Sequence, residues 1–147
     1  GAKLVVRFTR PLLEAIVMEG QLRDPAAAKY LVDALLGRRW KIGHDWLDGL
    51  TPFDDFVMKG DALCGFDLAV RYGIARDGAL VQYDDAGEIV DERLVGRDGA
   101  VCTPLPRTKY GVLRLRTRRG DDLRPELQVH YTSEPSPHVL GVIRKPL

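Results

Sequence analysis

Three pairs of adjacent aspartates are the first candidates for chemistry in this chain: Asp54-Asp55, Asp84-Asp85 and Asp121-Asp122. Neighbouring carboxylates can bind a hard cation or exchange protons with a substrate, but a calcium cage needs six or more oxygen ligands from one organised loop. The run from Asp84 to Glu88 lacks the alternating acids of such a loop. We therefore predict that Asp84-Asp85 and Asp121-Asp122 lie in hairpin turns and that the chain has neither a metal site nor a cofactor.

Three arginines alternate along one predicted strand, at Arg114, Arg116 and Arg118. Because alternate side chains of a strand share a face, they could bind an anion such as phosphate or an acidic sugar. The next predicted strand puts three polar side chains on the matching face: Glu126, Gln128 and His130. Cross-strand charge pairs on a solvated sheet face account for both sets, and we favour that interpretation. Within this strand the arginine face carries no aromatic side chain, which weakens the case for binding single-stranded nucleic acid.

Nucleophilic catalysis finds little support in the sequence. Ser133 and Ser136 lie close to His138, but in a proline-rich stretch that is typical of a loop. A nucleophile needs a base and an orienting group, and adjacency in a loop provides neither. We predict no catalytic residue. A carboxylate-dependent enzyme with an anionic substrate is a third hypothesis, which requires two aspartates to meet Arg114 or Arg116 in one cleft.

The stretch 37–50 contains both tryptophans and a histidine. On a helical projection Trp46 falls in the apolar stripe and is predicted to be core, Trp40 lies at its margin, and His44 faces solvent. Arg38, Trp40 and His44 are therefore candidates for a binding surface, together with the arginine strand and His130.

Arg39 falls near the middle of the same apolar stripe. A charge there must be paired, because an unpaired buried charge is very costly. We predict that Arg39 ties the helix to the following domain, with a carboxylate acceptor. The candidate acceptors in this predicted seam are Asp54, Asp55 and Asp67.

The elements that position these residues change at about residue 50. Thr9 can cap a helix from Arg10 to Gly20, and Asp24-Pro25 is a strong start signal for a second helix. From Ala26 to about Leu47 the apolar positions recur at helical spacing. We expect residues 1–50 to form an antiparallel helical hairpin.

From Thr51 the period of the apolar positions changes to two, and turn signals become regular. The predicted strands are 56–58, 62–70, 79–83, 88–95, 100–105, 110–117, 126–132 and 139–144. Short strands without helices between them favour antiparallel pairing. The predicted fold is α+β: the hairpin, then an antiparallel β-sandwich or open barrel of about seven to eight strands over 51–147, packed together as one unit.

Composition limits the partners. The 147 residues include 22 Lys and Arg against 21 Asp and Glu, so the net charge of +1 provides no field that would attract nucleic acid. No apolar run is long enough for membrane insertion. Cys64 and Cys102 lie in apolar sequence; a disulfide is one alternative, but we predict buried reduced thiols.

Several short segments together resemble the C-terminal part of a family of large uncharacterised bacterial proteins. They are Asp24-Pro25, Tyr30-Leu31, Leu35-Leu36, Arg38-Arg39, Lys41-Ile42-Gly43, Trp46, Pro52-x-Asp54-x-Phe56, Leu63-Cys-x-Phe66-Asp67-Leu68 and the stretch 139–144. The resemblance implies a position after a larger region with a kinase-like look, and it implies no activity for this part. The start at Gly-Ala, without Met, likewise leads us to expect a piece of a longer protein.

The leading hypothesis is a noncatalytic accessory module that binds the upstream region of its own parent protein. The alternative is a β-sandwich that binds a small ligand or carbohydrate. It requires an exposed aromatic row beside a groove, formed by Trp40, Tyr72, Tyr83 or Tyr110.

Overall fold

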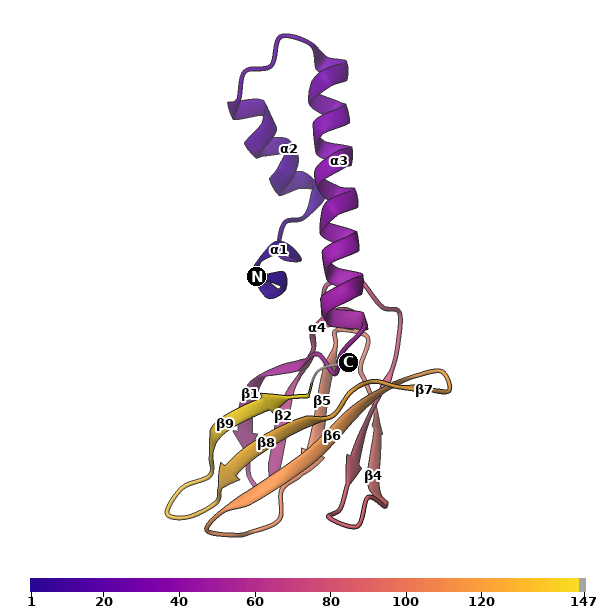
Figure 1. Cartoon of the computed structure of the whole chain (residues 1–147). Coiled ribbons are helices and arrows are strands. Elements are labelled where there is room, and N and C mark those ends of the chain that lie inside the picture. Colours follow the sequence, from indigo (N-terminus) through magenta and orange to yellow (C-terminus); the bar gives the residue numbers. More distant parts are fainter. Residues whose placement is uncertain (146–147) are drawn as a thin grey trace.

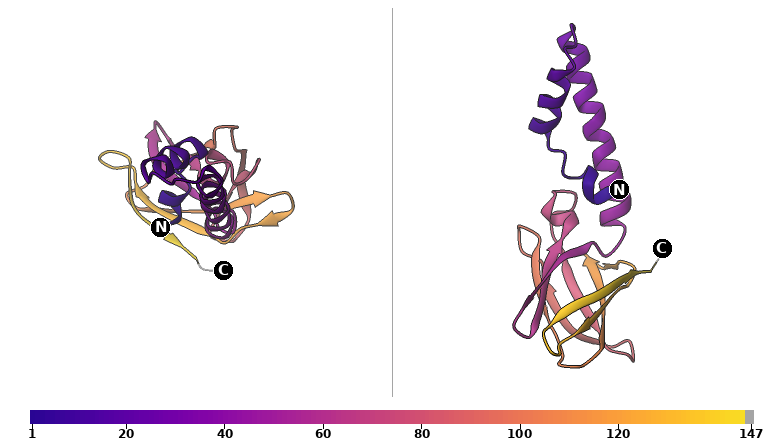
Figure 2. Two further views of the ribbon diagram at one scale, coloured as in Figure 1. Left: turned by 90° about the horizontal axis from the view of Figure 1, so that it is seen from above. Right: turned by 90° about the vertical axis from the view of Figure 1, so that its left-hand side faces the viewer.

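The computed structural model describes residues 1–145, and in it a helical arm stands on one end of a β-domain (Figure 1). Seen from the side in Figure 2, the arm continues the long axis of the molecule, while the view from above looks down the arm. The arm contains α1 (Ala2–Val5), α2 (Arg10–Glu19), α3 (Pro25–Gly43) and a π-helical turn, η1 (His44–Asp48).

The longest helix, α3, begins where the sequence predicts it. The carboxylate of Asp24 accepts a hydrogen bond from the backbone N–H of Ala26 at 2.9 Å, and Pro25 occupies the first helical position. Both features favour a helix start, because proline has no N–H to satisfy and the aspartate satisfies one that is unpaired. Helix α2 lies against α3 and runs in the opposite direction (Figure 1).

The end of the second helix differs from the prediction. We expected one α-helix to about Leu47, with Trp46 in the core, but the last turn from His44 is π-helical. A π turn winds more slowly than an α turn, so it shifts the faces of the residues that follow. Leu47 takes the buried position at 7 % exposure, whereas Trp46 is 63 % exposed, so the prediction for Trp46 is wrong.

The rest of the chain forms antiparallel strands, which confirms the α+β class. One sheet has the order β1-β2-β5, and the other has the order β4-β3-β6-β8-β9, with β7 beside β6. Their bounds are β1 (Phe53–Lys59), β2 (Ala62–Asp67), β3 (Ala79–Tyr83), β4 (Ile89–Leu94), β5 (Ala100–Pro104), β6 (Gly111–Arg119), β7 (Asp122–Leu123), β8 (Leu127–Thr132) and β9 (His138–Arg144). A short helix that we did not expect, α4 (Leu68–Arg71), follows β2.

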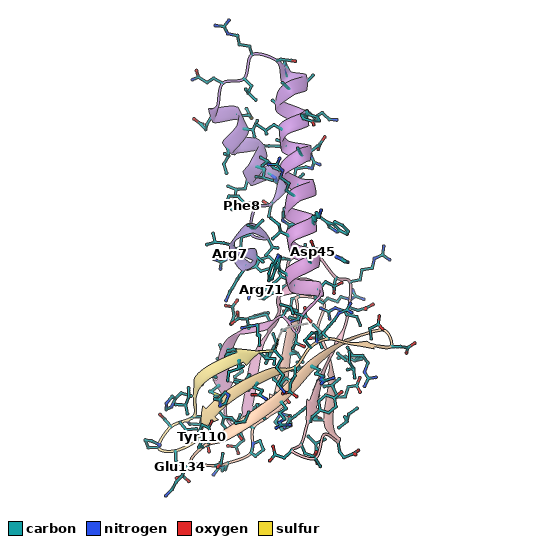
Figure 3. The ribbon with its side chains drawn as sticks, viewed as in Figure 1. Arg7, Phe8, Asp45, Arg71, Tyr110 and Glu134 are labelled. Carbon is teal, nitrogen blue, oxygen red and sulfur yellow. A yellow bond between two sulfur atoms is a disulfide. The ribbon has the colours of Figure 1, made fainter. Side chains whose placement is uncertain are left out.

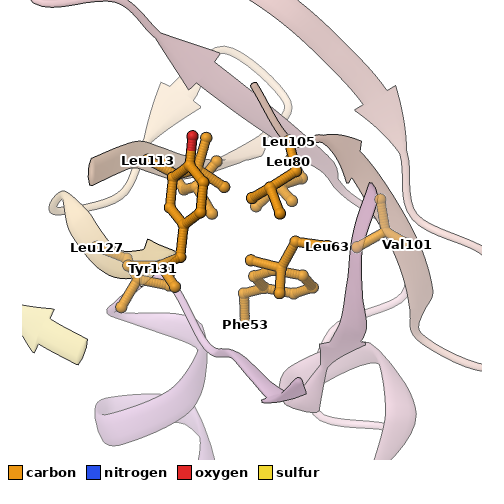
Figure 4. Close-up of a cluster of buried hydrophobic side chains, with 10 residues drawn as sticks. Phe53, Leu63, Leu80, Val101, Leu105, Leu113, Leu127 and Tyr131 are labelled. Atoms are coloured by element: carbon orange, nitrogen blue, oxygen red, sulfur yellow. The ribbon is translucent and has the colours of Figure 1, made fainter. Parts of the chain in front are cut away.

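Both sheets contribute side chains to one main core (Figure 4). In β5, β6 and β8 alternate positions point inward, as the period of two in the sequence predicts, whereas β3 is buried along four consecutive residues and β4 is largely exposed. The buried members are Phe53, Leu63, Leu80, Val101, Leu105, Leu113, Leu115, Leu127, Val129 and Tyr131. Separate small clusters hold the arm: Leu13, Val17 and Val32 pack between α2 and α3, and Val6 and Leu47 pack on α4. No helix of residues 1–145 is both long and apolar enough to cross a membrane.

Cys64 and Cys102 form a disulfide, which corrects the prediction of reduced thiols. They are direct cross-strand partners in the pairing of β2 with β5. Apolar neighbours in the sequence indicated burial, and the Cys64 side chain is buried. The pairing register, which brings Cys102 opposite Cys64, depends on contacts between distant residues that local sequence does not reveal.

Candidate functional site

The most buried ion pairs between the two parts of the molecule centre on Arg119, at the end of β6. Its Nη2 lies 2.8 Å from both carboxylate oxygens of Asp67, and its Nε lies 2.9 Å from Asp48 in η1. The side chains of Arg119 and Asp67 are 9 % and 2 % exposed. Asp67 also accepts a hydrogen bond from Val70 at the start of α4. This buried arrangement fixes the base of the arm to the sheet.

A second polar contact joins α1 to β1. Lys3 donates a hydrogen bond of 2.6 Å to Asp55, and Arg71 lies 3.3 Å from the other oxygen of that carboxylate. Asp55 has a φ of 56°, a left-handed conformation that aspartate tolerates better than most residues. Asp54 is within 3.4 Å of both Lys3 and Arg144. The predicted seam acids therefore do lie at the seam.

Arg39, however, does not bind any of the three predicted acids. Its Nε donates to the backbone carbonyl of Val6 at 3.0 Å, and its Nη2 donates to the carbonyl of Tyr72 at 2.9 Å. The predicted tie from the helix to the second part of the chain is therefore present, but the predicted acceptors are wrong. The three acids pair with other cations instead. Asp54 and Asp55 lie near Lys3 of α1, Asp54 also near Arg144 of β9, and Asp55 near Arg71 of α4. Asp67 pairs with Arg119 of β6.

The Asp55 contact should make attachment of α1 sensitive to acid. The hydrogen bond from Lys3 holds the pKa of the Asp55 carboxyl below its ordinary value. Because the pKa is lower in the folded protein, the contact stabilises the fold above the pKa of an unfolded aspartate, about 3.9, and is lost as the pH falls further. We expect α1 to loosen below about pH 4, measured by the fluorescence of Trp46, whose groove includes Ala2.

The matched control for this titration is Asp55→Asn, measured with Trp40→Phe in both proteins so that Trp46 is the one tryptophan. Asparagine tolerates the left-handed backbone but cannot ionise. We expect it to show the loosened state at neutral pH and to lack the transition below about pH 4. An unchanged acid transition in Asp55→Asn would show that another carboxylate controls α1.

A groove follows α3 along the arm. Two adjoining pockets of about 310 and 440 Å³ share Val5 and Ile42 among their lining residues. Phe8 lies where α1, α2 and α3 come together (Figure 3). The complete lining is Gly1, Ala2, Val5, Phe8, Leu13, Leu35, Arg38, Arg39, Ile42 and Trp46. The α3 members follow helical spacing and so form one continuous face with η1.

The groove is almost entirely apolar where Arg38 and Arg39 line it, because these two residues contribute mainly the carbon atoms of their side chains to its surface. Arg39 is bonded to the two carbonyls, and Arg38 makes no hydrogen bond or ion pair with any of residues 1–145. No carboxylate lines either pocket. The arm therefore presents an apolar surface with uncompensated positive charge, a combination that suits an apolar group next to an anion.

Beyond the groove, the arm exposes many large apolar side chains. They are Leu4, Leu12, Ile16, Met18, Leu22, Tyr30, Leu31, Trp40 and Trp46. His44 is exposed, as expected, and stacks on Trp40 with ring centroids 5.1 Å apart. Contiguous exposed apolar surface on a soluble domain often marks an interaction site, whereas scattered single residues need no explanation. The number of such residues on one short arm favours an interaction site.

The arginine face of β6 is largely neutralised by cross-strand partners. Arg118 lies 3.0 Å from Glu92 on the nearby β4, and Arg114 lies 3.8 Å from Asp85. Arg116 lies over the ring of Tyr83 at 5.6 Å instead. Gln128 is opposite Arg114, on the face predicted for it. The acidic neighbours of Arg114 and Arg118 are therefore Asp85 and Glu92, not the predicted residues of the next strand. Glu126 pairs with Lys145, and His130 contacts Tyr110.

The four candidate aromatic residues do not form a row. Trp40 lies on the arm, Tyr72 follows α4 and bonds to Arg7, and Tyr83 ends β3. Tyr110 is exposed, and its hydroxyl is 2.7 Å from Nδ1 of His130. Tyr110 and Glu134 lie at the end of the β-domain far from the arm (Figure 3). This distribution gives no aromatic platform for a sugar ring.

Carboxylates from separate elements do converge, but away from the arginine strand face. Asp48 and Asp67 meet at Arg119, in the buried contact between arm and sheet, whereas Asp85 is almost fully exposed beside Arg114. Asp84 accepts a hydrogen bond from the Glu88 N–H, which closes the predicted turn. Within residues 1–145 no group of acids, histidines and cysteines has the arrangement of a metal site.

Sequence reasoning missed three parts of this surface: Arg119, Asp48 and the α1 side of the groove. Arg119 is the last strand residue before Gly120, and strand alternation was the available signal, because it places Arg119 on the inward face with Leu115 and Thr117 rather than with Arg116 and Arg118. Val5 and Phe8 precede the first predicted helix. Their apolar character next to Lys3 and Arg7 was the available signal for a packed segment.

Comparison with known proteins adds no assignment to this geometry. No protein-family model matches the chain, and neither a curated protein nor a solved structure matches it.

Proposed function

We propose that this chain is a noncatalytic interaction module, a helical hairpin on a β-sandwich, that binds a partner protein segment along the arm. The observation that carries the proposal is the groove beside α3, whose lining is apolar apart from Arg38 and Arg39. Leaving so much apolar surface in water is unfavourable, at about 25 cal/mol per Å². A partner that covers it would gain that free energy.

The attachment of the arm supports this proposal. The arm is held by the buried contacts of Arg119, by the Lys3–Asp55 bond and by Arg39. A surface held in place before binding loses less conformational entropy when a partner docks. The β-domain therefore serves as the rigid base from which the arm projects.

The partner that we propose is the upstream region of a parent protein. This identity rests on the resemblance of segments such as Asp24-Pro25 and Lys41-Ile42-Gly43 to the C-terminal part of large bacterial proteins. Gly1 lines the groove next to Trp46, so a segment joined to Gly1 would emerge beside this surface. The disulfide fits an assembly formed in an oxidising compartment.

Calorimetric titration with the separately produced upstream region is expected to show saturable binding. Trp46→Ala and Arg38→Ala should each weaken it about tenfold or more, because aromatic and arginine side chains in the centre of an interface contribute most of the binding energy. The matched control is Trp40→Ala, which removes a tryptophan that is also more than half exposed but does not line the groove. It should change the affinity by less than about threefold.

Two results would contradict the proposal. The first is the absence of any heat of binding at several temperatures, with both proteins shown to be folded. The second is binding that Trp40→Ala weakens as strongly as Trp46→Ala, which would place the partner on the other side of α3.

A further inference from the structure

We infer that the segment that fills the groove is an amphipathic helix with an acidic side chain beside its apolar stripe, opposite Arg38. This inference rests on the proposed function and adds the chemistry of the partner. It combines three observations: the length of the groove, its open and apolar form, and the position of its charges.

The length of the groove suits a helix. Its lining on the arm extends from Leu35 to Trp46, and the eleven steps between these residues correspond to about 16 Å at 1.5 Å per residue. A partner helix that lies along α3 would cover this distance in about three turns, with apolar anchors at i, i+3 or i+4, and i+7. The two adjoining pockets provide places for successive anchors, one near Leu13 and Leu35 and one near Ala2 and Trp46.

The charges beside the groove determine which sign of charge a partner helix should carry. Arg38 and Arg39 line the pocket that also includes Leu13. Among the described residues no carboxylate lies within ion-pair distance of either guanidinium. Arg39 is oriented by the carbonyls of Val6 and Tyr72, whereas Arg38 has its donors available. An approaching carboxylate would therefore meet an uncompensated cation next to an apolar anchor site.

The other charged groups of the arm limit where along the groove the acidic side chain of the partner can lie. Asp45 is exposed beside His44, at 3.6 Å, toward the Trp46 end (Figure 3). Lys3 is occupied by Asp54 and Asp55, and Arg10 by Glu14 and Asp33. Asp45 lines neither pocket, so Arg38 is the charged residue of the groove lining with available donors, and the acidic side chain of the partner belongs near it.

Two synthetic peptides test the inference without knowledge of the natural partner. Both have 18 residues with leucines at helical spacing; the flanking positions carry glutamate in one peptide and lysine in the other. The chain carries Trp40→Phe, so that Trp46 in the groove reports binding by fluorescence. We expect the glutamate peptide to bind at least tenfold more tightly than the lysine peptide at low salt, and the difference to shrink as salt increases.

Arg38→Glu is expected to reverse this preference. It should weaken the glutamate peptide at least tenfold and strengthen the lysine peptide. The matched control is Arg23→Glu, the same change in charge at an exposed position in the turn before α3, outside the groove lining. It should alter either affinity less than twofold.

The outcomes separate this inference from the proposed function. If both peptides bind equally, or if Arg38→Glu and Arg23→Glu have the same effect, the acidic helix is wrong. If neither peptide binds but the upstream region does, the proposed function stands and the inference fails. If the glutamate peptide binds as expected and the upstream region does not, the groove chemistry stands and the identity of the partner is wrong.

Discussion

Replacement of Arg119 by methionine is expected to lower the free energy of unfolding by about 3–5 kcal/mol, the usual cost of removing one partner of a buried ion pair. Arg119 is the acid-binding group for both Asp48 and Asp67, and Asp67 is 2 % exposed. Without the guanidinium, the Asp67 carboxylate would remain buried with only the hydrogen bond from Val70. Urea unfolding followed by far-ultraviolet circular dichroism measures the change.

The matched control is Arg116→Met, on the same strand. Arg116 faces outward, and its neighbour across the strands is the ring of Tyr83, so its loss should cost less than about 1 kcal/mol. The double variant Arg119→Met with Asp67→Asn should recover part of the loss, because the amide has no charge to bury. Equal effects of Arg119→Met and Arg116→Met would show that the buried contact does not stabilise the fold.

The helices show how much local sequence determines. The start of α3 at Asp24-Pro25 depends on groups within two residues of each other, so the sequence alone predicts it. The class of the fold follows in the same way from the change in period after Thr51. What local sequence does not encode is the π turn from His44, where Leu47 rather than Trp46 packs in the cluster with Val6, Leu68 and Ala69.

The sequence predicted which acids lie at the seam between the arm and the sheets, but the predicted ion pair with Arg39 is wrong. The three predicted acids, Asp54, Asp55 and Asp67, do lie where the arm meets the sheets. They were predicted there because an arginine in the apolar stripe of the helix needs a partner for its charge. Which cation reaches which acid depends on the approach of α1, α4 and β6, and this is set by tertiary packing. Arg39 instead donates hydrogen bonds to two backbone carbonyls, and a helical projection does not reveal such acceptors.

The groove was the least predictable feature. Its α3 side could be read from the helical spacing, but Val5 and Phe8 come from a segment outside any predicted element. Arg38 was a candidate because of its sequence neighbours, and the structure places it at the groove without an acid among the described residues. A binding surface made from two segments requires their relative position, which pattern alone does not provide.

Reduction of the disulfide between Cys64 and Cys102 is expected to lower the free energy of unfolding by about 4 kcal/mol. The estimate comes from the entropy that the crosslink removes from the unfolded chain, since it closes a loop with a sequence separation of 38. The folded state should change little, because the cysteines belong to a continuous β2–β5 pairing from Ala62 to Phe66. Urea unfolding with and without reductant measures the difference, and a thiol assay counts the cysteines in each sample.

The double variant Cys64→Ala with Cys102→Ala separates the crosslink from other effects of the reductant. It should unfold at the lower urea concentration whether or not reductant is present, whereas the natural chain should shift only on reduction. Because the crosslink acts through the unfolded state, most of the loss should appear without any change in the fluorescence of the folded protein. Two reactive thiols in the untreated protein, or identical unfolding midpoints before and after reduction, would contradict a stabilising disulfide and return Cys64 to the role of a buried thiol in the β2 strand.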